Sequence, residues 1–292
     1  MIQFAGDTTE QQVWDMWKTV FGDSDDYMQL YFKYKYRNEN TLIYIEDDKA
    51  VSSLQMLSYK FTFCGEVIPV QYLSGVCTLP EYRGKGYARE LLLKSFEVAI
   101  ERGIPLVILV PQEDWLLSFY TKFGFALAFD SGTEQLPPLK KIIDDNQVDL
   151  YNAYKEFDSL FRNKDMAVQK SFQDFQAIAE EAALFNYPPK KNLRGMARII
   201  NSELLLDLFA AMYCDKAFTV SLKDEILKNN DSRFTVNQSI ISKDSSIIIQ
   251  PLLEFDIRDF TQAIMGYHTS EKAAPVNTLF PEKTPVMNYM LE

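Results

Sequence analysis

A short segment rich in glycine and basic residues is the part of this sequence best suited to binding a ligand. It follows a run typical of a β-strand, and apolar residues at helical spacing begin directly after it. Small residues let the backbone approach a ligand closely, and the free N–H groups of a helix's first turn favour a phosphate or pyrophosphate. The segment consists of Arg83, Gly84, Lys85, Gly86, Tyr87 and Ala88.

The residues alone allow two interpretations of this segment. It could bind a phosphate, or the pair of glycines could simply make an ordinary tight turn before a helix. A triphosphate-binding loop is excluded, since no Gly-x-x-x-x-Gly-Lys-Ser/Thr pattern is present. The strands before the segment look like consecutive hairpins, whereas a dinucleotide-binding unit would begin with a βαβ arrangement.

The first 130 residues predict a mixed sheet flanked by helices. Apolar spacing indicates amphipathic helices over 10–21 and 24–36, followed by antiparallel strands at 41–45, 50–63 and 67–79. A helix from 88 ends at Gly103, and the apolar run 104–110 reads as a buried strand. Strand, loop, helix and strand then form a right-handed crossover unit. A helix over 113–122 and one further strand complete the region.

Composition changes after Asp130, and the rest of the chain predicts two further parts. Residues 131–195 are punctuated by proline and glycine and then rich in helix formers, which indicates a helical connector. Residues 196–292 predict a small α+β domain. We expect in it a helix after Ser202, strands at 218–222 and 246–250, and a helix capped by Asp256 that stops at Gly266.

The segment and its surroundings resemble the GCN5-related N-acetyltransferases (GNAT). Arg83, Gly86 and Ala88 match the Gln/Arg-x-x-Gly-x-Gly/Ala motif of that family, and the segment from Tyr120 to Phe125 (YTKFGF) lies where the family places a similar one. The resemblance covers roughly residues 1–130. It implies the GNAT fold, an α+β fold with a mostly antiparallel central sheet, and transfer of an acetyl group from acetyl-CoA to an amine.

The resemblance also implies roles for individual residues. The loop at 83–88 would bind the CoA pyrophosphate, with Ser118 as a further cofactor contact. The strand holding Val76, Cys77 and Thr78 would pair through its backbone with the pantetheine arm, and a backbone N–H near Cys77 would polarise the acetyl carbonyl. Tyr120 would donate a hydrogen bond or proton to the CoA sulfur, as the matching tyrosine does in the family.

The order of parts along the chain looks like the Eis-type acetyltransferases, whose last domain is similar to sterol carrier protein. Those proteins usually hold a complete second acetyltransferase-like domain in the middle, and residues 131–195 are too few for one. We therefore expect a reduced middle segment. The same resemblance suggests the chain's terminal carboxylate, on Glu292, as the base that takes the amine proton; a water held by a pocket carboxylate is the alternative.

The reactive side chains favour direct attack by the amine over a covalent enzyme intermediate. Cys64, Cys77 and Cys214 match no zinc or disulfide framework and read as small apolar residues. The only histidine, His268, lies far along the chain from Cys77, so a thiol–histidine pair is not expected. We expect acetyl-CoA as cosubstrate and no metal.

Net charge limits the partners that we expect. At −11 the chain would repel nucleic acid, and the same field would favour cationic acceptors such as polyamines, basic antibiotics or lysine-rich peptides, although solubility alone also explains it. The first residues do not resemble an export signal, and no apolar run is long enough to span a membrane. We expect a cytoplasmic protein with no membrane partner, and self-association into a homo-oligomer is compatible with the sequence.

Three functions are weighed against one another. The first is acetylation of a small amine, with a cationic one favoured by the charge. The second keeps the chemistry and changes the acceptor to a protein N-terminus or a lysine side chain. The third is a non-catalytic sensor of acyl-CoA or lipid, and the presence of both Tyr120 and an intact loop at 83–88 disfavours it.

Overall fold

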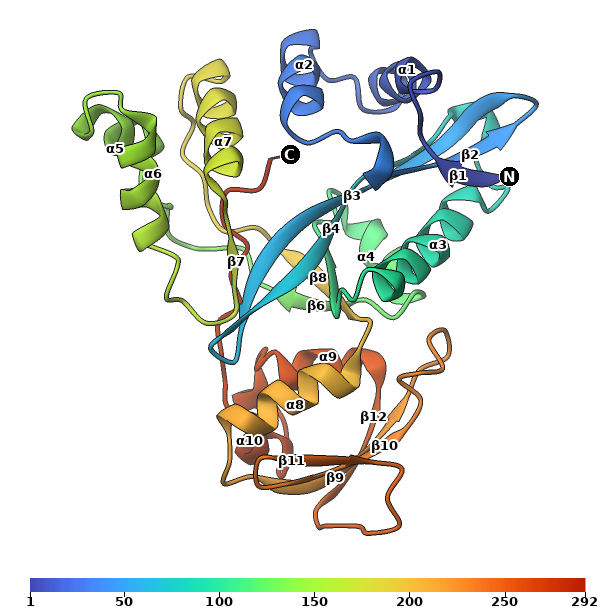
Figure 1. The fold of residues 1–292 in the computed structure, drawn as a ribbon, viewed down its shortest axis with the longest axis vertical. Coiled ribbons are helices and arrows are strands. Elements are labelled where there is room, and N and C mark those ends of the chain that lie inside the picture. Colours follow the sequence, from blue (N-terminus) through green and yellow to red (C-terminus); the bar gives the residue numbers. More distant parts are fainter. Residues whose placement is uncertain (292) are drawn as a thin grey trace.

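The computed structural model describes residues 1–291 of the 292-residue chain, which fold into two bodies, each built on its own sheet (Figure 1). The larger body holds an eight-stranded sheet with helices on both faces, and the smaller one a four-stranded sheet with helices on one side. Within the described residues, the search for a helix long and apolar enough to cross a membrane finds none.

The large sheet is mostly antiparallel. Its path runs β1-β2-β3-β4-β5-β8-β6, with β7 paired to β3, and β4 with β5 is its one parallel pair. A positive φ at Cys64 and Gly65 makes the tight turn between the two longest strands. The strands are β1 (Ile2–Phe4), β2 (Thr41–Glu46), β3 (Lys49–Phe63), β4 (Glu66–Thr78), β5 (Leu106–Leu109), β6 (Ala126–Phe129), β7 (Ala167–Gln169) and β8 (Gly195–Ile199).

Helices cover both faces of this sheet and share its apolar core. On one face, α1 (Glu10–Phe21), α2 (Asp25–Tyr34) and α7 (Phe172–Leu184) pack with the side chains of Leu57 and Tyr59. The other face carries α3 (Tyr87–Glu101) and α4 (Asp114–Thr121). The predicted α+β class and mostly antiparallel central sheet are therefore confirmed. Short 3-10 turns lie at Asn38–Asn40, Pro80–Tyr82 and Thr269–Glu271.

The middle of the chain contributes to the large sheet as well as to its helices. It forms α5 (Leu139–Asp145), α6 (Leu150–Ser159), β7 and α7, and then β8, which lies between β5 and β6. Residues 196–199 were expected in the last domain, but they form part of β8 in the large sheet. The physical reason is that β5 is fully buried, so its edge facing away from β4 requires a strand partner.

The smaller body has the strand order β11-β10-β9-β12, from β9 (Ala217–Lys223), β10 (Arg233–Asn237), β11 (Ile240–Lys243) and β12 (Leu252–Asp256). Its helices are α8 (Ser202–Met212), α9 (Ile257–Ile264) and α10 (Val276–Leu279). Asp256 caps α9 as predicted, accepting hydrogen bonds from two backbone N–H groups. The strand expected at 246–250 is wrong: this segment is irregular, and Ile247 and Ile248 are exposed.

A buried ion pair links the two bodies. Arg198 of β8 is fully buried and donates two hydrogen bonds, of 2.8 and 2.7 Å, to the carboxylate of Asp224, which follows β9. The guanidinium passes directly over Gly124, where a Cβ would stand 2.7 Å from the Arg198 Nε. Position 124, between Phe123 and Phe125, must therefore be glycine, because any side chain there would collide with Arg198.

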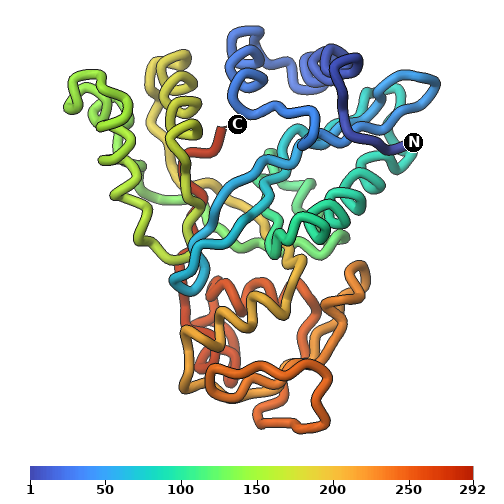
Figure 2. The backbone as a smooth tube through the Cα atoms, in the orientation of Figure 1, coloured from blue at the N-terminus to red at the C-terminus, as the bar shows by residue number. Residues whose placement is uncertain are grey.

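The last described residues run back from the smaller body into the larger one (Figure 2). Val286 exchanges backbone hydrogen bonds with Met166 and Val168, at 2.8 and 3.2 Å, and Leu193 donates to Met287 at 3.0 Å. The side chains from Met287 to Leu291 are all buried. This mostly apolar segment therefore packs inside the protein.

β4 contains an irregularity that depends on glycine. Its pairing with β3 shifts register between the pairs Ser53–Cys77 and Gln55–Ser74, which leaves an extra residue on β4. Within this bulge Gly75 has a φ of 57°, and a Cβ there would lie 2.4 Å from the Trp17 ring. The bulge and α1 are therefore packed too closely for any side chain at this position.

We predict that Asp224→Ala lowers the free energy of unfolding by about 3–5 kcal/mol, because it leaves the Arg198 charge buried without a partner. Urea denaturation followed by circular dichroism measures this. Asp144→Ala, which removes an exposed partner of Lys140, is the matched control and should change stability little. Equal effects of the two substitutions would contradict the assigned importance of the buried pair.

We also predict that Gly75→Ala lowers the free energy of unfolding by about 2–4 kcal/mol, from left-handed strain plus the collision with Trp17. Gly65→Ala is the matched control, since Gly65 has a φ of 78° with no atom near its Cβ position. The control carries only the strain, about 1 kcal/mol. Thermal melts of both variants test the difference, and a control as damaging as Gly75→Ala would refute the collision.

Candidate active site

The candidate site begins where two neighbouring strands part. β4 pairs with β5 only through residues 70–72 and 106–108, although β4 continues to Thr78. Beyond Tyr72, no described strand pairs with the β4 edge that faced β5. This leaves a notch in the sheet with unpaired backbone groups along one side, which suits a ligand with amide groups of its own.

The glycine-rich loop lies at the end of this notch, between β4 and α3. Gly84 and Gly86 have φ values of 80° and 90°, and no heavy atom lies within 4 Å of the Cβ position of either. The loop is therefore open on the side where side chains would stand. α3 begins at Tyr87, and the N–H groups of its first turn are directed out of the helix end. This geometry fits a pyrophosphate.

The loop carries two cationic side chains, Arg83 and Lys85, and a carboxylate binds the second. The Lys85 Nζ lies 3.3 Å from both carboxylate oxygens of Glu46, which also accepts a 2.7 Å hydrogen bond from the Tyr87 hydroxyl. That hydrogen bond from Tyr87, together with Lys85, lowers the pKa of Glu46. Arg83 is exposed and donates from Nε to the Thr78 carbonyl oxygen at 3.2 Å.

Tyr120 is buried in α4, on the face of the sheet that carries α3. It shares an apolar cluster with Leu73, which follows Tyr72 where the strands part, and Val76 packs against the same cluster. Its ring meets Phe125 edge-on at a centroid distance of 5.7 Å. Its hydroxyl makes no hydrogen bond within the described residues, and burial raises the pKa of Tyr120. It therefore remains a proton donor near neutral pH.

Other predicted residues take different orientations. Cys77 is buried on the opposite face, packed in a cluster with Val13 and Met16 of α1, and its thiol lies 3.3 Å from the Ser53 hydroxyl. Thr78 places its hydroxyl 2.8 Å from that of Ser52.

Burial also raises the pKa of Cys77 to about 11, so its thiol is protonated at neutral pH. Ser118 is exposed, and its hydroxyl donates to the Trp115 carbonyl oxygen at 2.9 Å within its own helix. Glu292 lies outside the described residues.

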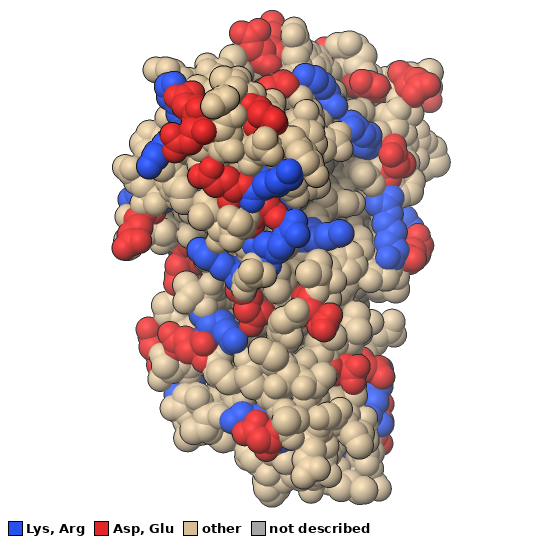
Figure 3. Space-filling view, turned by 60° about the vertical axis from the view of Figure 1, so that its left-hand side comes forward, with Lys and Arg blue, Asp and Glu red and all other residues tan. Residues whose placement is uncertain are grey.

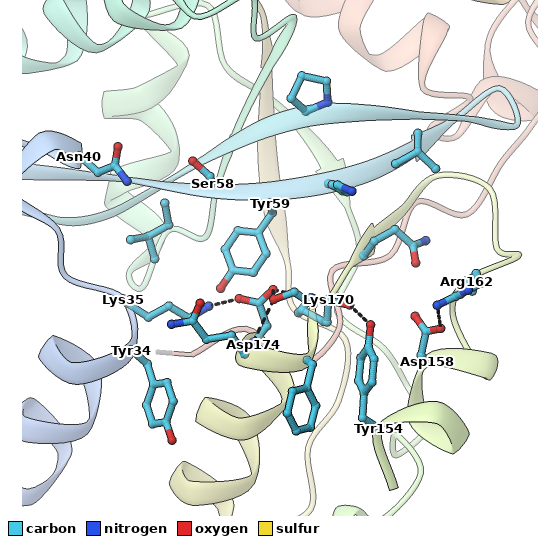
Figure 4. A pocket seen from close by; sticks show the side chains of 18 of the residues that line it. Tyr34, Lys35, Asn40, Ser58, Tyr59, Tyr154, Asp158, Arg162, Lys170 and Asp174 are labelled. Atoms are coloured by element: carbon cyan, nitrogen blue, oxygen red, sulfur yellow. Dashed lines mark hydrogen bonds and ion pairs between the residues drawn. The ribbon is translucent and has the colours of Figure 1, made fainter. Parts of the chain in front are cut away.

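A large cavity opens on the other face of the sheet, and sequence reasoning missed it. It has a volume of about 830 Å³ and lies between α2, α6, α7, β3 and the start of β4 (Figure 4). Lys35, Lys170 and Asp174 meet at its base, beneath Tyr59 of β3. The capping box formed by Ser171 and Asp174 was readable in the sequence, but nothing in the sequence placed it beside α2.

Metal chemistry has no evident ligand set in the part of the chain that the structure describes. Within residues 1–291 no group of three or more histidine, cysteine, aspartate or glutamate side chains is arranged to hold a metal ion.

Comparisons with known proteins agree with this geometry. Residues 2–128 match the family model described as acetyltransferase (GNAT) domain. A GCN5-related N-acetyltransferase from Anabaena variabilis has a similar fold, with a TM-score of 0.68 and 14% identity over 98% of both chains. Eis1 from Mycobacterium abscessus is also similar, with a TM-score of 0.65 and 13% identity, again over 98% of both chains. A comparison with curated protein sequences finds no match.

The structural likeness extends beyond the matched domain. A GCN5-related N-acetyltransferase from Kribbella flavida aligns over 100% of this chain and 97% of its own, with a TM-score of 0.64 and 13% identity. At such identities the likeness shows a shared fold. Residues 2–128 thus match the GNAT acetyltransferase domain in sequence, and the fold, the notch and the loop are consistent with that match.

Proposed function

We propose that the protein transfers the acetyl group of acetyl-CoA to a primary amine by direct attack within a ternary complex. The observation that carries this proposal is the notch between β4 and β5, which opens next to the glycine-rich loop at 83–88. Such an arrangement holds a thioester and its pyrophosphate at fixed separation, so that the acetyl carbonyl is aligned for attack.

In this proposal the backbone binds most of the cosubstrate. The N–H groups at the start of α3 hold the pyrophosphate, with the exposed side chain of Arg83 nearby. The free edge of β4 from Val76 to Thr78 pairs with the pantetheine arm, and a backbone N–H beside Cys77 polarises the acetyl carbonyl. The bulge at Gly75 re-aims these backbone groups out of the regular ladder.

Tyr120 is proposed to protonate the departing thiolate. Burial without a hydrogen-bond partner among the described residues keeps its hydroxyl protonated and free to donate. Ser118, being exposed and bonded within its own helix, is left with a minor role as a contact for the cofactor. A covalent acetyl-cysteine is disfavoured, since the pKa of Cys77 is raised and its side chain faces α1.

Removal of the amine proton falls to a carboxylate or to a water that a carboxylate holds. The carboxylate of Glu292 is our proposal for this base. It is supported by the burial of Met290 and Leu291, which share an apolar cluster with Trp17 and Tyr31 beneath the bulge of β4. A water held by a carboxylate of the cavity, such as that of Asp174, is the alternative base.

The organisation of the whole chain remains part of the proposal. We propose an acetyltransferase domain over 1–130, a reduced helical middle over 131–195 that adds β7 to the large sheet, and a last domain of sterol carrier protein-like type over 196–292, of which residues 196–199 complete β8 in the large sheet. Four strands with α8 and α9 packed against them support the last assignment. A cytoplasmic location and assembly into a homo-oligomer belong to the same proposal.

The direct test is release of free thiol from acetyl-CoA by the purified protein, measured with a panel of amines. The panel includes polyamines, aminoglycosides, lysine peptides and small amino acids, and mass spectrometry identifies each acetylated product. Acetylated product formed in step with thiol release supports transfer to an amine. Tight binding of acetyl-CoA with no transfer to any member would favour the sensor reading instead.

We predict that Tyr120→Phe lowers turnover about 100-fold or more, because it removes a positioned acid, while the Kd for CoA stays the same. Tyr151→Phe, at an exposed tyrosine of α6, is the matched control. Thiol release gives the turnover and calorimetry the Kd. A Tyr120→Phe enzyme with full activity would remove this residue from the mechanism.

A further inference from the structure

The cavity between α2, α7 and β3 is more basic than acidic, in contrast to the chain as a whole. Lys and Arg side chains gather near the middle of the face shown in Figure 3. The charged side chains that line the cavity are Lys35, Arg37, Lys60, Arg162 and Lys170, against Asp158 and Asp174.

Both acidic side chains of the cavity already have partners. Asp158 is in contact with Arg162 one helical turn further along the chain. Asp174 accepts hydrogen bonds of 2.7 Å from the backbone N–H and the hydroxyl of Ser171, and it also pairs with Lys35 (Figure 4). Neither carboxylate is therefore free to balance a further cation.

Lys170 is a buried cation of the cavity for which no salt bridge to a carboxylate is found among the described residues. It is 6% exposed, and its Nζ donates to the Asn288 side-chain oxygen at 3.1 Å. Burial lowers the pKa of Lys170 to about 7; the nearby Asp174 opposes this shift and Lys35 adds to it. The ammonium group of Lys170 has three N–H donors, and its hydrogen bond to Asn288 uses one of them. An anion in the cavity would accept hydrogen bonds from the others.

The cavity extends to one strand away from the point where β4 and β5 part. Leu57 lines the cavity and pairs in register with Tyr72, the last residue of β4 that has a partner on β5. Leu57 and Tyr59 face α2, whereas Tyr120 lies on the opposite face of the same sheet. The notch is thus approached from one face by the cavity and from the other by the proposed acid.

We propose that this cavity receives the acceptor, and that Lys170 with Lys35 binds an anionic group, a carboxylate or a phosphate, carried by that acceptor. The inference rests on the proposed acetyl transfer and names its substrate class: small primary amines that also bear a negative charge. A volume of about 830 Å³ lies within the range of small-molecule sites. The excess of cationic over acidic side chains in the cavity lining disfavours a polycation there despite the net charge of −11.

The experiment compares acceptors that differ only in the anionic group. β-Alanine is paired with propylamine to test a carboxylate, and phosphoethanolamine with ethanolamine to test a phosphate. We expect kcat/KM for the preferred anionic member to exceed that of its uncharged partner by about 10-fold or more, the scale of a charge-assisted hydrogen bond. The pair that shows the preference identifies the group.

Variants connect the preference to the cavity. Lys170→Met should remove most of the preference, because it lowers kcat/KM for the anionic amine much more than for its uncharged partner. Lys60→Met, at an exposed lysine on the rim, should reduce the preference for the anionic amine less than Lys170→Met does. Because this lysine is exposed, we expect the substitution to affect folding little. Lys155→Met, at an exposed lysine of α6 that does not line the cavity, is the matched control.

A second readout separates this inference from the function on which it rests. Inorganic phosphate and succinate, at constant ionic strength, should raise the Tm of the wild-type protein and of Lys155→Met more than that of Lys170→Met. If these shifts appear but no amine is acetylated, the anion site stands and acetyl transfer falls. If uncharged amines are acetylated with the same kcat/KM as their anionic partners, the anion site is overturned. The same holds if both cavity variants keep the preference for the anionic amine.

Discussion

The limited pairing between β4 and β5 is the constraint on which the proposed site depends. Three residue pairs hold the strands together, and everything proposed for acetyl transfer lies at or beyond their end. A parallel pair that stops early in the middle of a sheet would be free to close up unless both strands were fixed elsewhere. β5 is fixed by β8 on its other edge, and β4 is fixed by its long hairpin with β3 and by the contact of Gly75 with Trp17.

The local features of the fold were predictable because they rest on neighbouring residues. The hairpin at Cys64 and Gly65, the crossover through α3 and the cap at Asp256 each depend on a few adjacent positions. The isoleucine run at 246–250 has the composition of a strand but pairs with no strand of the sheet. Composition alone does not show whether a pairing partner exists. The glycine-rich loop at 83–88 was also predictable, because its conformation depends on adjacent residues.

The cavity was not predictable, because its residues come from distant parts of the chain. Lys35 ends α2, Tyr59 lies in β3, and Lys170 precedes α7, so tertiary packing alone brings them together. Their charges also oppose the overall composition. A net charge of −11 describes the field far from the surface, whereas a small molecule inside a cavity responds to the few groups within a Debye length of about 8 Å. The expectation of a cationic acceptor relied on the first quantity.

The position of β8 decides how this protein can be divided. The matched acetyltransferase domain ends at residue 128, yet the strand between β5 and β6 comes from residues 195–199. A fragment cut at the domain boundary would carry two unpaired, apolar strand edges, β5 and β6, which are templates for aggregation. The same topology delays folding, because β5 must wait for a partner some ninety residues further along the chain. We therefore expect the segment matched in sequence to need residues 195–199 in order to fold stably.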